Sequence, residues 1–179
     1  MVSRFRGLRA FVPLTVAAVL LVGVAGCGSS SSSGGTVIRG TTDQPVGTDP
    51  AGVYDLPSWD LLVNIYQTLL TIPPGGNKPV PDAAKSCDFT NPTTYECTMQ
   101  DGLKFSDGSP LTAQDVKFSY ERNVGIADPE GASSLLADMK SIEAPDPKTV
   151  IFHLKKPDAV WPFITTVQSM AIVPSDVFP

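Results

Sequence analysis

The sequence has few of the residues that catalytic, metal and nucleic-acid sites need. Its 179 residues include one histidine, three cysteines and 13 basic residues against 18 acidic ones. No HExxH or GxSxG motif and no phosphate-binding glycine loop with its lysine is present. These absences argue against a hydrolase, a zinc enzyme and a nucleic-acid partner. A glycosidase that uses two carboxylates stays open, although no pair of acids is marked by its spacing. We therefore expect a protein that is not an enzyme and has no metal or cofactor.

One long apolar run occurs, near the N-terminus. Three arginines precede the apolar residues 10–22, and the small residues 24–26 lead directly to Cys27. This order is typical of a secretory signal peptide, which we place at residues 1–26. A transmembrane anchor is the alternative, but the run is shorter than the ~20 residues that a spanning helix needs.

The residues around Cys27 specify the kind of signal. Val-Ala-Gly followed by cysteine resembles the lipobox of bacterial lipoproteins. The resemblance implies that Cys27 is acylated and becomes the new N-terminus. Residues 27–36 then form a lipidated tether, whose eight Ser and Gly residues reach ~15 Å as a random coil. We expect a protein anchored by lipid to the cell membrane, on its periplasmic or outer face.

The other two cysteines predict a disulfide. Cys87 and Phe89 share one face of an expected strand, and Tyr95, Cys97 and Met99 share the same face of the next. A hairpin that turns at residues 91–93 pairs Cys87 with Cys97, and an exported pair is normally oxidised. The spacing is not of the CxxC type, so we interpret the bond as structural.

Further strands and two helices are expected along the body. One helix begins with Ser58 as its cap and has apolar residues at helical spacing as far as residue 70. A second begins at Thr112, which forms a capping box with Asp115 and is followed by Val116, Tyr120 and Val124 on one side. The remaining strands are expected at 37–42, 103–106, 140–144 and 149–154. His153 lies on the solvent side of the last strand, opposite Val150, Phe152 and Leu154. The class is mixed α+β.

The stretch DGLKFSDGSPLTAQDVKFSYER, residues 101–122, resembles a signature of family 5 extracellular solute-binding proteins, the oligopeptide, dipeptide and nickel receptors of ABC importers. Supporting matches occur in the same order as in that family: GTDPA, WDLLVNIYQTLL, PDAAKS and AIVPSDVF. The resemblance covers almost all of residues 37–179.

The resemblance implies a periplasmic-binding-protein-like fold of type II. Residues 37–179 would be the N-terminal part of the first lobe, with the second lobe absent, because two lobes of ~100–200 residues do not fit in this length. The chain is then either the N-terminal fragment of a longer gene product or a truncated remnant.

The resemblance also implies a function and a set of contact residues. The receptor would capture a peptide or another small solute and deliver it to the ABC permease subunits. Asp43 would meet the free ammonium group of a peptide, although a solvated turn acid is the alternative. Trp59 and Trp161 are alternatively packing residues. The candidate ligand-binding residues are Thr42, Asp43, Gln44, Tyr54, Trp59, Ser133, Ser134 and Trp161.

A second function stays open. A chain with one lobe does not enclose a ligand between two lobes, so it would be a structural or interaction lipoprotein without ligand trapping. The identity of the ligand, whether dipeptide, oligopeptide, nickel complex or sugar, is not decided by these residues.

Overall fold

The computed structural model describes residue 38 and residues 40–179. The predicted signal peptide, Cys27 and the Ser/Gly tether lie outside these described residues. Within the described part of the chain, no helix is both long and apolar enough to cross a bilayer.

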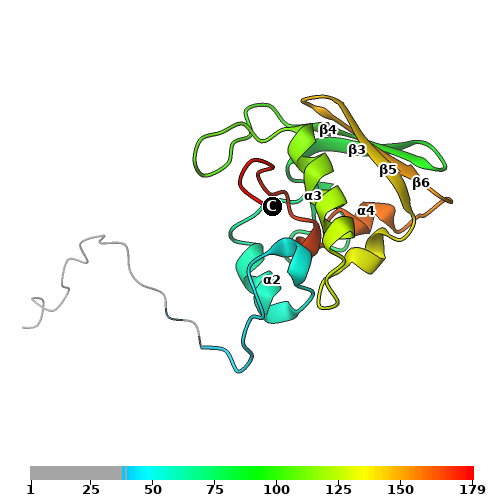
Figure 1. The fold of residues 1–179 in the computed structure, drawn as a ribbon. Helices are drawn as coiled ribbons and strands as arrows, with labels where there is room; N and C mark the ends of the chain where they lie inside the picture. Colours follow the sequence, from blue (N-terminus) through cyan, green and yellow to red (C-terminus); the bar gives the residue numbers. More distant parts are fainter. Residues whose placement is uncertain (1–37, 39) are drawn as a thin grey trace, which may run out of the picture. The chain divides into compact units, whose positions relative to one another are not determined.

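A four-stranded antiparallel sheet organises the chain after residue 83 (Figure 1). It consists of two hairpins whose strands lie in the order β3-β4-β6-β5. The strands are β3 (Ala84–Asn91), β4 (Thr94–Met99), β5 (Met139–Asp146) and β6 (Thr149–Leu154). Within this sheet β3 and β5 each pair on one side only, so both are edge strands.

The first hairpin has the predicted register. Phe89 pairs with Tyr95, and Cys87 pairs with Cys97. The two cysteines form a disulfide with their Cα atoms 4.0 Å apart. At the turn, the Asn91 side chain accepts a hydrogen bond from the Thr93 N–H at 3.0 Å. The predicted disulfide hairpin is therefore confirmed.

The second hairpin confirms both predicted strands, with β5 longer than expected. The Asp146 carboxylate accepts hydrogen bonds from the N–H groups of Lys148 and Thr149 at 2.7 and 3.0 Å, which closes the turn. Alternate residues of β6, including Val150 and Phe152, are buried. His153 lies on the opposite, partly exposed face, as predicted, with its Nε2 atom 3.2 Å from Glu143.

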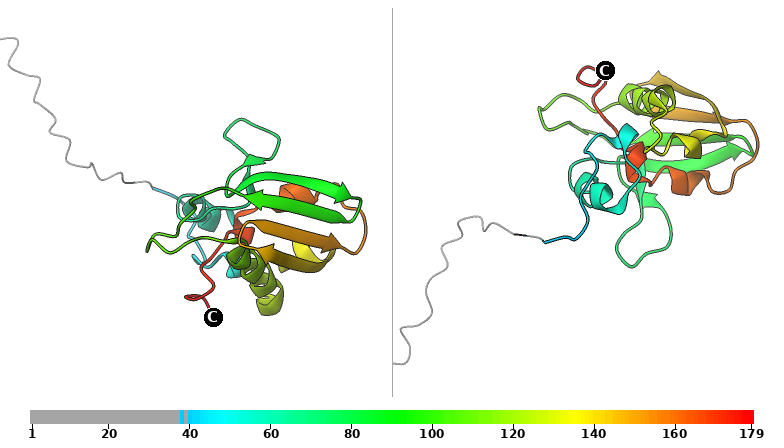
Figure 2. Two further views of the ribbon diagram at one scale, coloured as in Figure 1. Left: turned by 90° about the horizontal axis from the view of Figure 1, so that it is seen from above. Right: turned by 60° about the horizontal axis from the view of Figure 1, so that its bottom comes forward.

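Helix α3 (Ala113–Ile126) begins at the predicted capping box. The Asp115 carboxylate accepts hydrogen bonds from both the N–H and the hydroxyl of Thr112 at 2.9 Å. Val116 and Tyr120 are fully buried, and the helix packs against β5 and β6 (Figure 2). Val124, predicted on the same side, is 45% exposed at the far end of the helix.

The core is centred on Phe152. Its ring centroid lies 4.9 Å from that of Tyr120, 5.4 Å from that of Trp161 and 6.5 Å from that of Tyr95. Burial raises the pKa of the Tyr95 hydroxyl to about 12, and it raises the pKa of the Tyr120 hydroxyl as well. The rings of Tyr120 in α3 and Phe152 in β6 are in contact. Helix α3 and β6 are thus joined by aromatic packing.

The helix predicted from Ser58 to residue 70 is wrong in its extent. Helix α2 (Leu56–Leu62) begins earlier, because Asp55 caps it by accepting a hydrogen bond from the Ser58 N–H at 2.9 Å. The chain then becomes extended and forms β1 (Leu70–Thr71), which pairs with β2 (Val80–Pro81). The Thr68 N–H donates a hydrogen bond to the Asp82 carboxylate at 3.0 Å. In a helix, the same N–H would have bonded to a carbonyl four residues earlier in the chain.

Two predicted strands do not form as expected. Ile38 and residues 40–42, the described part of the first one, are not in a strand, and Ile38 is 91% exposed. A strand needs a partner for its backbone groups, and no described residue pairs with this stretch. Residues 103–106 form a single bridge, between Lys104 and Pro110, within a tight turn.

The remaining elements are short helical turns. They are η1 (Pro50–Gly52), η2 (Ser133–Leu136) and η3 (Gln168–Met170), each of which contacts α3, and α4 (Trp161–Ile164), which packs on the sheet through Trp161.

Candidate functional site

One charged pair ties the segment before α2 to helix α3. The two terminal nitrogens of Arg122 donate hydrogen bonds to the two carboxylate oxygens of Asp49 at 2.8 and 2.7 Å. Asp49 also accepts the Ala51 N–H at 3.1 Å and so begins η1. The hydrogen bonds from Arg122 hold the pKa of Asp49 below its ordinary value, against the opposite effect of partial burial. The segment that carries the predicted ligand residues is therefore anchored to the sheet-and-helix region.

Arg122 also contacts the last residues of the sequence. Its Nε atom donates to the Pro179 carbonyl at 2.9 Å, and its guanidinium lies 5.1 Å from the centroid of the Phe178 ring. The Arg122 side chain is 7% exposed, whereas that of Asp49 is 44% exposed. One nearly buried cation therefore joins three segments that are distant in the sequence.

The loop after α3 packs closely on η1. A Cβ atom built on Gly131 would lie 2.3 Å from the Ala51 carbonyl oxygen, which is far too close for any side chain. Glycine at position 131 is therefore required for this contact.

Two of the predicted ligand residues touch each other. Tyr54 and Trp59 pack edge to face with their ring centroids 5.1 Å apart. Trp59 donates its indole N–H to the Ser169 hydroxyl at 3.2 Å, which holds α2 against η3. Tyr54 remains 50% exposed, so its ring is available at the surface.

The three predicted residues Thr42, Asp43 and Gln44 are exposed in a loop. The Asp43 N–H donates to the Thr41 hydroxyl at 3.2 Å, which gives this loop a local turn. The Asp43 carboxylate is thus at the surface, and its contact with a ligand stays a prediction.

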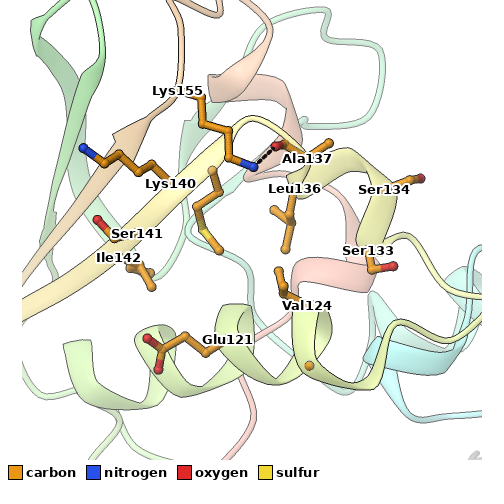
Figure 3. A pocket seen from close by; sticks show the side chains of 12 residues that line it. Glu121, Val124, Ser133, Ser134, Leu136, Ala137, Lys140, Ser141, Ile142 and Lys155 are labelled. Atoms are coloured by element: carbon orange, nitrogen blue, oxygen red, sulfur yellow. Dashed lines mark hydrogen bonds between the residues drawn. The ribbon is translucent and has the colours of Figure 1, made fainter.

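Ser133 and Ser134 belong to η2 and line a hollow of about 520 Å³. The hollow lies between α3, η2 and β5 (Figure 3). Neither the exposed loop at residues 42–44 nor the Tyr54–Trp59 pair lines it. The predicted residues therefore do not gather at one place in the described part of the chain.

Trp161 is not placed to contact a ligand. It is fully buried and packs on Phe152 at the start of α4. The short helix turns the indole onto the buried face of the sheet, so the alternative packing role is the one that the structure supports.

Among the described residues, no group of three or more histidine, cysteine, aspartate and glutamate side chains is arranged to hold a metal ion. The site consists of polar loops, one nearly buried arginine and an open hollow. These features suit binding by hydrogen bonds and shape.

Comparison with known proteins identifies the family. The family described as "Bacterial extracellular solute-binding proteins, family 5 Middle" matches residues 78–178. The chain belongs to this family. The match includes both hairpins, α3 and the hollow, and it confirms the resemblance seen in residues 101–122.

Relatives of known name and structure agree with this assignment. The Escherichia coli K12 protein named "Probable D,D-dipeptide-binding periplasmic protein DdpA" is 33% identical over 138 residues, which cover 73% of this chain and 26% of that protein. The solved structure of the Escherichia coli murein tripeptide binding protein MppA has a TM-score of 0.66 at 25% identity, over 75% of this chain and 30% of that one.

A further similar structure was solved with a bound ligand. The binding protein AgaA of A. tumefaciens R10, in complex with agropinic acid, has a TM-score of 0.65 at 27% identity, over 74% of this chain and 27% of that one. The chain thus spans between a quarter and a third of the length of these proteins, and it has the fold of the corresponding part of periplasmic binding proteins.

Two contacts in this family 5 chain were not anticipated from the sequence. Asp49 belongs to GTDPA and Arg122 ends the 101–122 stretch, so both were noticed as parts of motifs and not as partners. Opposite charges 73 residues apart carry no pairing signal in one sequence. Gly131 likewise stands in a turn-like stretch, where the sequence does not reveal the carbonyl of Ala51.

Proposed function

We propose that this chain is part of a solute receptor of an ABC importer, which captures peptides or similar small solutes and passes them to the permease. The observation that carries the proposal is the family 5 match together with the relative named for D,D-dipeptides. The AgaA complex with agropinic acid is the reason to include solutes other than peptides. No catalysis is expected, and a bound solute is released unchanged.

The receptor works outside the cytoplasmic membrane. The names of DdpA and other relatives describe periplasmic proteins, which supports this location. The lipid anchor at Cys27 rests on the lipobox-like residues before it. Replacing Cys27 by serine should move the protein from the membrane fraction to the soluble exported fraction. Retention of the variant in the membrane fraction would contradict the anchor and leave the solute-binding proposal intact.

The exposed residues Thr42, Asp43, Gln44 and Tyr54 are the proposed contacts for the solute. Asp43 presents a carboxylate at the surface, and a peptide has a free ammonium group of opposite charge. Trp59 supports the Tyr54 ring by edge-to-face packing. Ser133 and Ser134 lie at the separate hollow and are proposed to contact a solute only there.

Thermal unfolding with added solutes tests the proposal. The panel consists of a D,D-dipeptide, an L,L-dipeptide, a tripeptide and the N-acetylated form of each. A ligand at 100 times its Kd stabilises the folded state by about 2.7 kcal/mol, which raises Tm measurably. We expect at least one free-amino peptide to raise Tm and its acetylated form to do so much less.

Asp43→Asn is the matched variant and Asp176→Asn is its control, since both acids are exposed. The first should reduce the Tm shift of the free-amino peptide, and the second should preserve it. If no peptide of the panel shifts the Tm of the folded protein, peptide capture by this chain is contradicted and the interaction lipoprotein becomes the better description.

A further inference from the structure

The hollow next to Ser133 and Ser134 has an open strand edge as one wall. Four consecutive residues of β5, from Met139 to Ile142, line it on one side. On the other side lie residues of the last turns of α3, including Val124 and Gly125. The hollow is therefore a groove between an edge strand and a helix (Figure 3).

The backbone of β5 is unpaired on the side away from β6. Apart from the pairing with β6, no described residue forms a backbone hydrogen bond with residues 139–143. Further along the strand, the Gln114 side chain donates to the Ala144 carbonyl at 2.7 Å and covers the edge there. An edge that is covered at one end and open beside a groove is a template for another strand.

The interior of the groove is apolar. Leu136 and Ile142 are buried at its base, and Val124 is 45% exposed above them. Figure 3 shows the side chains of Leu136, Val124 and Ile142 directed toward the hollow from three different elements. Alternate side chains of an added strand would enter this interior, because successive side chains of a strand point to opposite faces.

Two of the three charged residues that line the groove are lysines. The Lys155 ammonium donates to the Ala137 carbonyl at 2.7 Å. Lys140 also lines the groove and forms no ion pair with any described residue. The one acid of the rim, Glu121, is already paired with Lys117 at 2.5 Å. The chain as a whole has a formal charge of −5, so this local excess of positive charge favours an acidic side chain in the occupant.

We propose that this groove binds an extended segment of a partner protein, with an acidic side chain, as an added strand along β5. The backbone edge supplies hydrogen bonds, the apolar interior takes one or two side chains, and Lys140 and Lys155 receive the acid. The proposal does not rest on solute capture, because neither residues 42–44 nor the Tyr54–Trp59 pair lines the groove.

Gly125 offers a way to block the groove with little damage to the fold. A Cβ atom at this position meets no atom within 4 Å, so a large side chain has room to enter the hollow. Gly125→Trp fills the groove. Ile126→Trp places the same side chain on the neighbouring helical residue, which is 44% exposed and does not line the groove.

The probe is a fluorescent hexapeptide of alternating valine and threonine with one central aspartate, acetylated and amidated so that it resembles an internal segment. Its binding to the purified protein is followed by anisotropy. We expect Gly125→Trp to weaken binding by about tenfold or more, and Ile126→Trp to leave it within about twofold. A probe with lysine in place of aspartate, and one with alternate N-methylated amides, should each bind several-fold more weakly.

The outcomes separate this proposal from its competitors. If Gly125→Trp unfolds, the double variant Lys140→Glu, Lys155→Glu takes its place, with loss of binding to the aspartate probe as the expected result. Equal effects of the two tryptophan variants, or no binding at millimolar protein, would overturn the proposal. A requirement for free peptide termini would assign the groove to solute capture. Self-association of the protein that Gly125→Trp abolishes would assign it to a second copy of this chain.

Discussion

The sheet with α3 and the segment before it differ in how they bury apolar side chains and how their backbone groups form hydrogen bonds. In the first region, residues 84–154, alternating side chains of β4 and β6 are buried and neighbouring strands supply the hydrogen bonds. In the second region, residues 41–71, the regular elements are short and several large apolar side chains are exposed, among them Val46, Tyr54, Leu56, Val63 and Ile65. The segment is held by single contacts such as the pair of Asp49 and Arg122. Local periodicity therefore describes the first region well and the second poorly.

The largest expected effect is in the sheet region, at its aromatic centre. Phe152→Ala removes a fully buried ring that packs on Tyr120 and Trp161, and it should lower the free energy of unfolding by about 3–5 kcal/mol. Phe163→Ala is the matched control, because this ring is 41% exposed, and it should cost less than about 1 kcal/mol. Urea unfolding measures both. A similar loss in the two variants would contradict the assignment of Phe152 to the centre of the core.

The disulfide is the next largest contribution. Replacing Cys87 and Cys97 by alanine should lower the free energy of unfolding by about 2.5–3 kcal/mol, because the bond restricts a short loop in the unfolded chain. Reductant should lower the urea midpoint of the native protein toward that of the variant. The midpoint of the variant itself should not respond to reductant, and a response would indicate another source of the effect.

The contact between the two regions is tested at Gly131. Gly131→Ala places a Cβ atom against the Ala51 carbonyl, and relief of the clash should cost about 1–3 kcal/mol. Gly125→Ala is the control, because this glycine lies in α3 with open space around it. It should stabilise the protein by about 0.5–1 kcal/mol through helix propensity. An unchanged stability in Gly131→Ala would show that the Ala51 backbone yields to the added Cβ atom, and would contradict the requirement for glycine at position 131.

The charged anchor should contribute less, since Asp49 is partly exposed. A double-mutant cycle with Asp49→Asn and Arg122→Met should give a coupling energy of about 1 kcal/mol at neutral pH. The more exposed pair of Lys117 and Glu121 in α3 should give about 0.5 kcal/mol or less. Equal coupling in the two pairs would show that Arg122 acts as an ordinary surface residue.

The same anchor gives stability a defined dependence on pH. Arg122 lowers the pKa of Asp49 in the folded state, so the stabilisation is fully present above the ordinary pKa of about 3.9. It is lost as the pH falls through the lower pKa of the folded state. The difference in unfolding free energy between the native protein and Asp49→Asn should therefore shrink from pH 7 toward acid pH. A difference that grows on acidification would contradict the assigned sign.

The elements that were predicted correctly have all their signals close together. The hairpin of Cys87 and Cys97 combines alternation with a turn, and α3 combines a capping box with apolar spacing. The helix from Ser58 failed because Leu69 and Leu70 have the right spacing for a helix, yet extended backbone there pairs with residues beyond 80. Apolar spacing indicates only which secondary structure a segment prefers. The residues that form hydrogen bonds with the backbone of this segment lie elsewhere in the chain.

The candidate site shows the same division. Exposure of Thr42, Asp43 and Gln44 agrees with their polar character, but Trp161 is in the core, because an aromatic residue next to a turn has no local mark of the direction in which it points. The pairing of Asp49 with Arg122 and the groove along β5 were not visible in the sequence. Both depend on where the ends of α3 lie relative to distant segments.

The sequence by itself determined the two hairpins, the disulfide register, the start of α3 and the family. The exported, lipobox-like leader stays a prediction from the sequence. Those features rest on the order and spacing of neighbouring residues, which are properties of a linear chain. Only the tertiary structure decided that Trp161 packs inside, that Arg122 joins three segments, that Gly131 allows the close approach to η1, and that β5 has an open edge beside a groove. Each of these features depends on which residues, distant in the sequence, lie next to the side chain or strand in question. Only the packing of the folded chain specifies those neighbours.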